Sequence, residues 1–515
     1  MRNGKIILAK GIKFDKSYNQ VVNISESDRL SIIENASVYS SSTYSFIRET
    51  GRIRVNARYG VCLQANYLAF QNPDYASKWF FAFIDKVNYI SNGTSEIEYT
   101  VDVFSTWFPY VDLKPCFVVR EHVTDDTVGS NTQTESVDLG EIIINSVTRD
   151  LDHILTIPVI ALTDSYSTPG TGAGGIYGKV PSGLNYYKIN NSESSINHVI
   201  GELNQSGRIE ILSSLFIAPL WLVNGDVPSG VDIQAITSGT QNGYSLSVPK
   251  QSSLNGYTPR NKKLLTFPYC YTIAFNGAGG TNIYKQELFS SSNLTFGVEG
   301  VLTPGCSIVL YPTNYKSYGD DFMEILPLGK YPIGSFNTDT YATWLAQNSV
   351  NIGFDIVGQG ISGIGNVASG NIGGAVGNLM SLAQTGLMTS SNVSLVPNVT
   401  KGNLNSGDVM HAMELIHFSF YNVSIKQEFA RIIDDYFTHF GYRVNRIKTP
   451  NISRRQNYNY VQVDNSESPC QPNVNNTYIV PSNDLDLINN LFRRGVTIWN
   501  NYTNFGDYSV SNNIV

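Results

Sequence analysis

Residues 78–107 read KWFFAFIDKVNYISNGTSEIEYTVDVFSTW, and this stretch decides the fold class. Two strand-like runs flank Ser91-Asn92-Gly93-Thr94, where Asn-Gly favours a tight hairpin because both residues tolerate a positive φ. The second run has the period-2 pattern of a strand, with Ile97, Tyr99, Val101 and Val103 on one face and Glu96, Glu98, Thr100 and Asp102 on the other. The stretch therefore predicts a β-hairpin with an apolar face and a carboxylate face.

The carboxylate face has two readings. Three carboxylates on one side of a strand are usually a solvated surface. In a protein that forms a tube, the same face could line the lumen, so Glu96, Glu98 and Asp102 are candidate lumen-lining residues. Association of copies through sheet edges would also cover the strand edges that this hairpin otherwise exposes.

Composition extends the β-rich prediction to the whole chain. The 515 residues are several times a typical domain, so two to four domains are expected. Charged residues make up only 15% and aromatic residues 12%, including 31 Tyr, which suits strands with polar turns better than helical bundles. The formal charge of -7 argues against a protein that binds nucleic acid by neutralising its phosphates. If the protein formed a conduit, a mildly acidic inner wall would let DNA pass without adhering to it.

The order of patterns along the chain suggests four parts. A strand-rich unit ends near residue 150, and a Gly/Pro/Ser-rich stretch at 163–186 reads as a long surface loop. Short apolar runs at 209–212 and 216–221 read as strands of a second β-rich region. We expect these parts: an N-terminal β domain at 1–150, the second β-rich region at 151–340, a long uncharged loop at 341–405, and a helix-plus-strand part at 406–515.

Two helices are predicted in the last part. Residues 425–441, IKQEFARIIDDYFTHFG, carry an S-x-x-Q capping box at Ser424 and Gln427 and end at Gly441. The apolar positions fall on one face that we expect to pack on a sheet: Ile425, Phe429, Ile432, Ile433, Tyr436, Phe437 and Phe440. A shorter helix is expected from Asp484 to Arg494, capped by Ser482 or Asn483 and followed by Gly495 and a strand at 496–499.

Residues 356–400 contain no Asp, Glu, Lys, Arg or His. The segment has no run of about 20 mostly apolar residues, so a permanent transmembrane helix is rejected. Ten glycines between Gly353 and Gly386 argue against a core helix. Three readings remain open: a buried structural insert, a disordered apolar linker, or a loop that is sequestered in one state and enters a lipid bilayer in another.

No catalytic or cofactor motif stands out. Residues 121–126, EHVTDD, gather an imidazole and three carboxylates, for which a turn with Asx-type hydrogen bonds is a far commoner explanation than metal binding or acid–base chemistry. The G-x-G-x-x-G match at 170–175 is followed by Pro181 and Gly183, which prevent the helix that a phosphate site needs. The five cysteines are far apart. We therefore expect no catalytic residue, no metal and no cofactor.

Several short motifs resemble one known family. They are KWFFAFI at 78–84 with Asn92 and Glu96, VDVF at 101–104, Thr106-Trp107, Lys114-Pro115, VREHV at 119–123 with Asp125-Asp126, Gly441-Tyr442, and GVTIW at 495–499. The pattern is similar to that of the tail knob, or distal tail tube, proteins of Salas-type short-tailed bacteriophages. This chain differs in being shorter, with an unusually Gly-rich loop.

The resemblance implies a β-rich α+β fold: tube-forming β-barrel or sheet domains with a few packing helices and a long apolar loop insertion, assembled as a hexameric ring. It implies a structural protein of the virion, at the distal end of the tail, and no enzyme, because cell-wall cleavage in these phages is assigned to a separate tip protein. The implied partners are other copies in a homohexamer, the lower collar and tip proteins, viral DNA that passes without specific binding, and host cytoplasmic membrane lipid.

In that family a long apolar loop plugs the lumen and later engages the host membrane. Segment 356–400 lies where such a loop belongs, ahead of the C-terminal elements. The candidate membrane-active residues are Ile356, Val357, Ile361, Ile364, Val367, Ile372, Val376, Leu379, Met380, Leu382, Leu387, Met388, Val393, Leu395 and Val396. The alternatives are a receptor- or polysaccharide-binding tail protein, whose Tyr and Trp would stack on sugars, and a static baseplate or collar component.

Overall fold

The computed structural model describes residues 2–47, 51–171, 174–177, 180–237, 243–276, 280–302, 307–316, 335–337, 417–475 and 478–515. The chain folds into two compact units, each made of segments that are distant in sequence. Unit 1 comprises Met1–Asp138, Pro259–Leu264 and Glu428–Val515, and unit 2 comprises Leu139–Thr258 and Leu265–Gln427.

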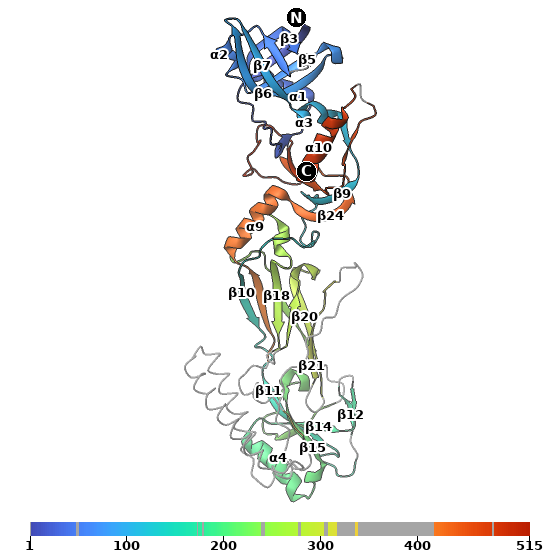
Figure 1. Cartoon of the computed structure of the whole chain (residues 1–515). Coiled ribbons are helices and arrows are strands. Elements are labelled where there is room, and N and C mark those ends of the chain that lie inside the picture. Colours follow the sequence, from blue (N-terminus) through green and yellow to red (C-terminus); the bar gives the residue numbers. More distant parts are fainter. Residues whose placement is uncertain are drawn as a thin grey trace. The chain divides into compact units, whose positions relative to one another are not determined.

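The first part of unit 1 is a closed six-stranded barrel (Figure 1). The strands follow one another around the barrel in this order: β1 (Arg2–Ala9), β3 (Ser37–Ile47), β4 (Arg52–Val55), β7 (Thr94–Val101), β6 (Lys78–Ser91) and β5 (Tyr67–Asn72). The predicted hairpin is confirmed as β6 and β7, with Ser91 opposite Thr94. Because the barrel is closed, both strands are paired on each side within one subunit, so the expectation that the hairpin has exposed edges is wrong.

The second strand of the hairpin is shorter than expected. β7 ends at Val101, and Asp102 caps the short helix α3 (Val103–Trp107) by accepting a hydrogen bond from the Ser105 N–H at 3.1 Å. The side chain of an Asp that bonds the N–H three residues later starts a helix instead of continuing a strand. The alternating pattern therefore overestimated the strand, and Val103 lies in the helix.

The rest of unit 1 is a five-stranded sheet with helices. Its strand order is β2 (Gln20–Val22), β27 (Val496–Trp499), β25 (Tyr458–Val463), β9 (Cys116–Glu121) and β24 (Tyr442–Lys448), while β8 (Val111–Leu113) pairs with β26 (Cys470–Pro472). The longer helices are α1 (Glu26–Asn35), α9 (Gln427–Phe440) and α10 (Ser482–Arg494), and α2 is the short turn Tyr59–Cys62. The predicted C-terminal helix and the strand after Gly495 are thus confirmed as α10 and β27. The helix starts two residues earlier than expected, and its N-cap is Pro481 instead of Ser482 or Asn483.

Helix α9 is confirmed, but its start and its buried face differ from the prediction. Ser424 and Ile425 belong to strand β23 (Ser419–Ile425), and the Ser424 hydroxyl accepts a hydrogen bond from Asn145 at 2.7 Å instead of capping the helix. Ile432 is 66% exposed, whereas Asp434 is fully buried. The apolar periodicity missed this carboxylate because its hydrogen-bond partners are distant in sequence.

Unit 2 contains three larger sheets and a hairpin. The four-stranded sheet has the order β10 (Ile142–Arg149), β23, β18 (Cys270–Phe275) and β19 (Thr281–Tyr284). The five-stranded sheet has the order β16 (Ile233–Ala235), β14 (Asn185–Ile189), β11 (Thr156–Leu162), β15 (Leu212–Pro219) and β22 (Ser335–Asn337). The remaining strands are β17 (Gly243–Pro249), β20 (Asn293–Val301) and β21 (Ser307–Pro312) in one sheet, and β12 (Gly175–Tyr177) and β13 (Val180–Ser182) in the hairpin.

Three local expectations for unit 2 need correction. The stretch 163–186 is not a plain loop, since it contains the β12–β13 hairpin. Residues 209–211 form a 3-10 turn after the unpredicted helix α4 (Glu193–Gln205), and the strand starts only at Leu212. That strand stops at Pro219, and residues 220–223 form a second 3-10 turn. This turn ends at Asn224, which takes a left-handed conformation with φ 60°. The β-rich α+β class is confirmed.

Candidate functional site

The predicted membrane-active segment, residues 356–400, lies outside the described residues. The role of its apolar side chains therefore stays a prediction. The described chain stops at β22 and resumes at residue 417, just before β23. Among the residues that the structure describes, no helix is long and apolar enough to cross a membrane.

The three candidate lumen carboxylates do not form one solvated face. Glu96 is 4% exposed and pairs with Arg54 at 2.7 Å and Arg52 at 3.3 Å. Asp102, the cap of α3, is 2% exposed and accepts a hydrogen bond from the Tyr67 hydroxyl at 2.6 Å. Glu98 is partly exposed and lies 2.9 Å from Arg52. The expectation of a shared carboxylate face is wrong because of the helix cap, and a lumen-lining role for these residues stays a prediction.

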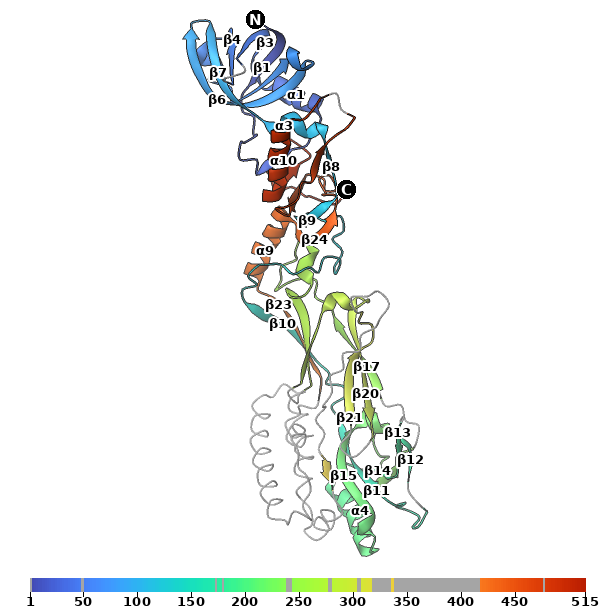
Figure 2. The ribbon, with the colours of Figure 1, turned by 45° about the vertical axis from the view of Figure 1, so that its right-hand side comes forward.

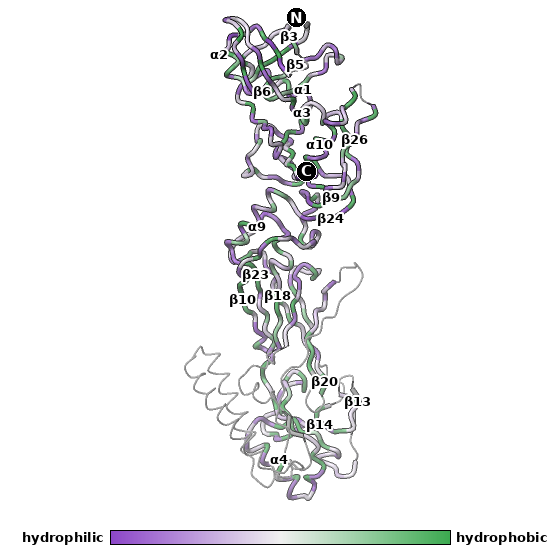
Figure 3. Tube along the Cα trace, in the orientation of Figure 1, coloured by the Kyte–Doolittle hydropathy of each residue, from purple (hydrophilic) through white to green (hydrophobic). Residues whose placement is uncertain are grey.

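The sheet β10-β23-β18-β19 in unit 2 has an unusual surface. Directly paired residues of antiparallel strands lie on the same face. The register places ten apolar residues on one face: Ile142, Ile144 and Val147 of β10, Tyr421, Val423 and Ile425 of β23, Tyr271, Ile273 and Phe275 of β18, and Ile283 of β19. Arg149, opposite Ser419, stands at one end of this set. We call these ten residues the apolar face, and Figure 3 shows hydrophobic positions recurring along its strands.

The opposite face of this sheet is the buried one. Phe420 and Ala274 belong to the core of unit 2, and Thr272 donates a hydrogen bond to Asn422 at 2.7 Å. An antiparallel sheet with one buried face normally has a polar outer face. Here the outer face is apolar, with Ile144 58% exposed and Ile283 50% exposed. An exposed apolar surface of this kind is typical of an interaction site.

Within the part of the chain that the structure describes, the outer strands of the same sheet are unpaired on one side. β10 and β19 each have a single partner strand among the described residues, and β10 lies beside β23 in Figure 2. β10 has eight residues, and its exposed apolar side chains do not protect the edge. On the apolar face Ile142, Ile144, Val147 and Ile283 are exposed, whereas Val423 and Ile425 of the central strand β23 are buried. Among the described residues, these exposed side chains and two strand edges are therefore available for association.

In the motif 121–126, His122 is a satisfied core residue. Its Nδ1 accepts a hydrogen bond from the Tyr460 N–H at 2.7 Å, so the protonated Nε2 donates to the Thr438 carbonyl at 3.0 Å. Burial, reinforced by the charge of Arg455, lowers the pKa of His122 to about 3. The ring is therefore neutral near pH 7 and has both nitrogens occupied, which leaves it no role in proton transfer.

Asp125 confirms the turn interpretation of the same motif. Its carboxylate accepts hydrogen bonds from the Thr127 N–H at 2.8 Å and from the Ser130 hydroxyl at 2.9 Å. The hydrogen bond from the Thr127 hydroxyl lowers the pKa of Asp125 most, and the bonds from the Thr127 N–H and the Ser130 hydroxyl lower it further. Within the described ranges, no group of three or more His, Cys, Asp or Glu side chains could hold a metal ion.

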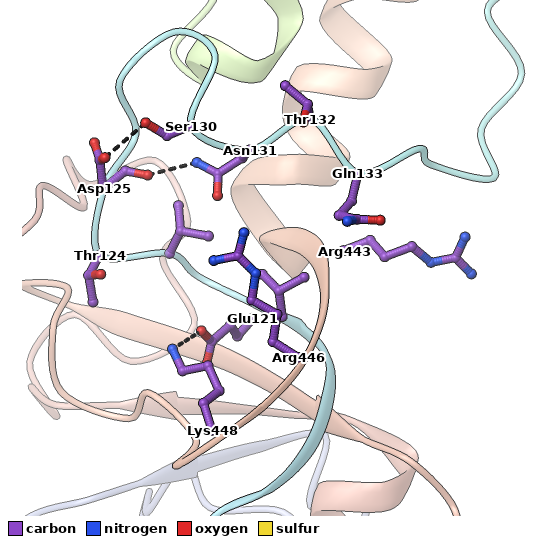
Figure 4. Close-up of a pocket in the computed structure, with 12 residues that line it drawn as sticks. Glu121, Thr124, Asp125, Ser130, Asn131, Thr132, Gln133, Arg443, Arg446 and Lys448 are labelled. Carbon is purple, nitrogen blue, oxygen red and sulfur yellow. Dashed lines mark hydrogen bonds and ion pairs between the residues drawn. The ribbon is translucent and has the colours of Figure 1, made fainter. Parts of the chain in front are cut away.

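A polar pocket lies beside this turn in unit 1 (Figure 4). Its volume is about 180 Å³, and loop 124–133 and strand β24 supply most of its wall. The lining residues are Glu121, Val123, Thr124, Asp125, Ser130, Asn131, Thr132, Gln133, Arg443, Val444, Arg446 and Lys448. Figure 4 shows the Arg446 side chain extending toward the loop.

A buried ionic cluster anchors the segment that leads out of unit 1. The Glu135 side chain is fully buried, pairs with Arg120, and accepts from Lys263 at 2.5 Å and from the Arg443 N–H at 2.8 Å. Burial lowers the pKa of Lys263, an effect that the nearby Glu135 opposes. Arg120 also donates to the Gly441 carbonyl at 2.7 Å. We call Arg120, Glu135 and Lys263 the ionic cluster; it joins β9, the extended segment after it and the short insertion 259–264.

Sequence reasoning did not find the ionic cluster or the apolar face. Glu135 stands in the polar stretch TQTESVD, which gives no sign of burial. The apolar face had a detectable signal, since Ile142, Ile143 and Ile144 are consecutive, but a continuous apolar run normally indicates a strand buried on both faces.

Comparison with known proteins first defines the class of protein. Residues 2–112 match the family described as the caudoviral major tail protein N-terminus. Residues 233–513, more than half of the chain, match the family described as "Bacillus phage phi29, Tail knob protein gp9, C-terminal domain". The chain is therefore a structural protein of a bacteriophage tail.

Within that class, the chain belongs to the tail knob protein gp9 family. It is 24% identical over 561 residues to tail knob protein gp9 of Bacillus phage PZA, with 92% of each chain covered. It is 23% identical to tail knob protein gp9 of Bacillus phage phi29, with 87% of this chain and 88% of that protein covered. The expected family and the location in the virion, at the distal end of the tail, are thereby confirmed.

A solved structure agrees on the fold. The bacteriophage C1 tail knob protein, gp12, superposes with a TM-score of 0.64 at 15% identity, covering 99% of this chain and 100% of that chain. At that identity the likeness concerns the fold alone.

Proposed function

We propose that six copies of this chain form the distal tube of the tail, through which the genome leaves the virion. Membership of the tail knob family supplies the setting. The observation that carries the proposal is the apolar face on a sheet whose outer strands, β10 and β19, lack a second partner among the described residues. Copies that pair β10 with β19 of the next subunit would form a ring, because a head-to-tail contact closes when its rotation divides a full turn.

The same contact would cover exposed apolar side chains. Fully burying an Ile contributes roughly 1.5–3 kcal/mol, and a side chain that is already half buried can gain about half of that. Ile142, Ile144 and Ile283 are 45%, 58% and 50% exposed in the isolated chain. Repeated at each of the six contacts, this gain supports a stable ring. The main-chain hydrogen bonds between the paired edges would also fix the register of the two strands.

Segment 356–400 plugs the lumen in this proposal and engages the host cytoplasmic membrane after release. Its lack of charged residues suits both a lumen closed to water and a bilayer. In lipid every backbone N–H and C=O must be paired, so the segments would become helical or associate with one another. DNA then passes without specific binding, in keeping with the net charge of -7. The lower collar and tip proteins are the proposed neighbours in the tail.

Cryo-electron microscopy of the full-length protein, with and without liposomes, tests the proposal. We expect a six-fold tube that is closed by residues 356–400 in buffer and opened on lipid. Monomers or trimers would contradict the proposed conduit. A hexamer in which this segment stays packed in the protein in the presence of lipid would contradict the proposed membrane step.

A further inference from the structure

The proposed conduit does not use the polar pocket of Figure 4, whose charged lining points to a ligand. We propose that the pocket binds a small oxyanion, the phosphate or carboxylate group of a larger molecule, with Arg446 as the principal ligand-binding residue. The proposal does not depend on the hexamer, because every residue involved belongs to unit 1.

The oxygens of both carboxylates in the pocket already accept hydrogen bonds within the protein. The Glu121 carboxylate pairs with Lys448 and accepts a second hydrogen bond from the Asn451 N–H at 3.0 Å. The Asp125 carboxylate is occupied by the Thr127 and Ser130 donors of its own turn. The oxygens of both carboxylates are therefore engaged, but Asp125 keeps its negative charge because its donors are neutral, and Lys448 is occupied by Glu121.

The remaining positive charges are not compensated. The Arg446 guanidinium forms no hydrogen bond or ion pair with any residue that the structure describes. The Arg443 guanidinium only approaches the Thr134 carbonyl and the Ser136 hydroxyl, both at 3.4 Å. A guanidinium presents a planar fork of donors that matches a carboxylate or phosphate with two parallel bonds. With three cationic side chains against two carboxylates, the lining carries one net positive charge and offers guanidinium donors suited to oxyanions.

Neutral polar groups complete the pocket. The side chains of Thr124, Thr132 and Gln133 line it and make no hydrogen bond within the described part of the chain. Hydroxyl and amide groups can donate to an oxyanion or bind the hydroxyls of the molecule that carries it. The volume of about 180 Å³ is below the roughly 300–1,000 Å³ of sites for drug-sized ligands, so the pocket fits one head group instead of an extended ligand.

Isothermal titration calorimetry of the full-length protein with inorganic phosphate, at constant ionic strength, tests the proposal. We expect one saturable site per chain with roughly millimolar affinity, since Arg446 is exposed and its pairing is weakened by water. Arg446→Gln should weaken binding at least tenfold. Arg58→Gln removes the same charge from an exposed position of unit 1 outside the pocket and should leave binding unchanged.

Two further measurements complete the test. Thr132→Val with Gln133→Leu keeps the charge and should weaken binding several-fold if the neutral donors contribute. Titration with acetate distinguishes the sources, because the tighter of the two ions identifies phosphate or carboxylate as the natural group. Absence of a saturable site, parent-level binding by Arg446→Gln, or equal loss in Arg58→Gln would overturn the proposal. Unchanged oligomeric state and melting temperature of each variant show that folding is not the cause.

Discussion

The ammonium nitrogen of Lys78 lies 3.8 Å from the centroid of the Tyr110 ring. The rings of Trp107 and Tyr478 complete a cage, at 4.9 and 5.0 Å, and Lys78 is 1% exposed. Its nitrogen has no hydrogen-bond partner among the described residues, and burial lowers the pKa of Lys78 to about 8. Aromatic faces attract a cation, but here they replace the water and acceptors that an ammonium normally has.

This cage predicts the effect of removing the charge. Because the folded-state pKa of Lys78 lies below its ordinary 10.5, the charged form opposes folding below pH 8, and this penalty disappears as the pH rises from 8 to 10.5. Lys78→Met keeps the packing and should raise the free energy of unfolding at pH 7 by roughly 1–3 kcal/mol, with less gain at pH 10. Urea unfolding at both pH values measures this. A Met variant that is less stable at pH 7 would show that the cation–ring attraction exceeds the desolvation penalty.

Neutral His122 predicts a loss of stability in acid. Its folded-state pKa of about 3 lies below the ordinary 6.5, so the unfolded chain binds an extra proton between these values. Stability should therefore fall as the pH drops below 6.5, by up to about 1.4 kcal/mol per pH unit from this residue, until pH 3.

His122→Gln isolates that contribution. Glutamine can both accept and donate a hydrogen bond, so the variant should be less stable at pH 7 but lose less stability between pH 6.5 and 4 than the parent. His198→Gln, at a largely exposed position, serves as the control and should keep the parent slope. Equal slopes for the parent and His122→Gln in urea unfolding would show that His122 does not titrate as predicted.

The ionic cluster predicts strong coupling between Glu135 and Lys263. Glu135→Gln leaves the buried charges of Arg120 and Lys263 uncompensated and should cost about 3–5 kcal/mol. Lys263→Met in the same chain removes one of these charges, so the double variant should be less destabilised than the sum of the single variants. Additive losses in a double-mutant cycle would mean that the pair makes no net contribution.

The apolar face predicts a variant that folds but does not assemble. Ile144→Asp places a charge at the third residue of β10, where Ile144 is 58% exposed in the isolated chain, so the fold tolerates it but a neighbouring subunit would bury it. Val474→Asp is the matched control, because Val474 is 93% exposed and lies in unit 1. Native mass spectrometry should show hexamers for the control and smaller species for Ile144→Asp. Hexamers in both variants would place the subunit interface elsewhere.

The uncharged segment, residues 356–400, predicts a variant that assembles but does not act on membranes. Replacing Ile364, Val367, Ile372 and Val376 with Asp should leave assembly intact and abolish leakage of dye-loaded liposomes, because four carboxylates make entry into lipid unfavourable. Replacing the same residues with Leu should preserve leakage. Leakage at the parent level by the Asp variant would refute the membrane role of the segment.

The sequence predicted the structures that depend on neighbouring residues. The hairpin at Asn92-Gly93 and the helix that ends at Gly441 were found because turn and cap preferences are local. Pairings between distant segments were not found. Asp434 was not singled out, yet its buried carboxylate accepts hydrogen bonds from the Arg260 and Asn261 N–H groups at 2.8 and 3.0 Å, more than 170 residues away in the sequence.

Contacts between residues that are distant in the sequence also limited what could be predicted of the site. The motif EHVTDD was correctly interpreted as a turn because Asp125 bonds residues within its own loop. The pocket beside it required β24, whose Arg446 lies more than 300 residues later, and no local pattern relates the two. The expected tail knob family rested on short motifs and was confirmed, whereas the apolar face follows from strand register.

Division of unit 1 into three segments also constrains synthesis of the protein. Strand β9 pairs with β24 and β25, so its sheet stays incomplete until the ribosome has translated all of unit 2 and the C-terminal 88 residues, Glu428–Val515, have emerged. At about 5–20 residues per second, a nascent chain waits tens of seconds with β9 unpaired. The closed barrel, whose strands all precede residue 102, can fold at once. A nascent chain would therefore carry a folded barrel while the second sheet of unit 1 is still unfinished.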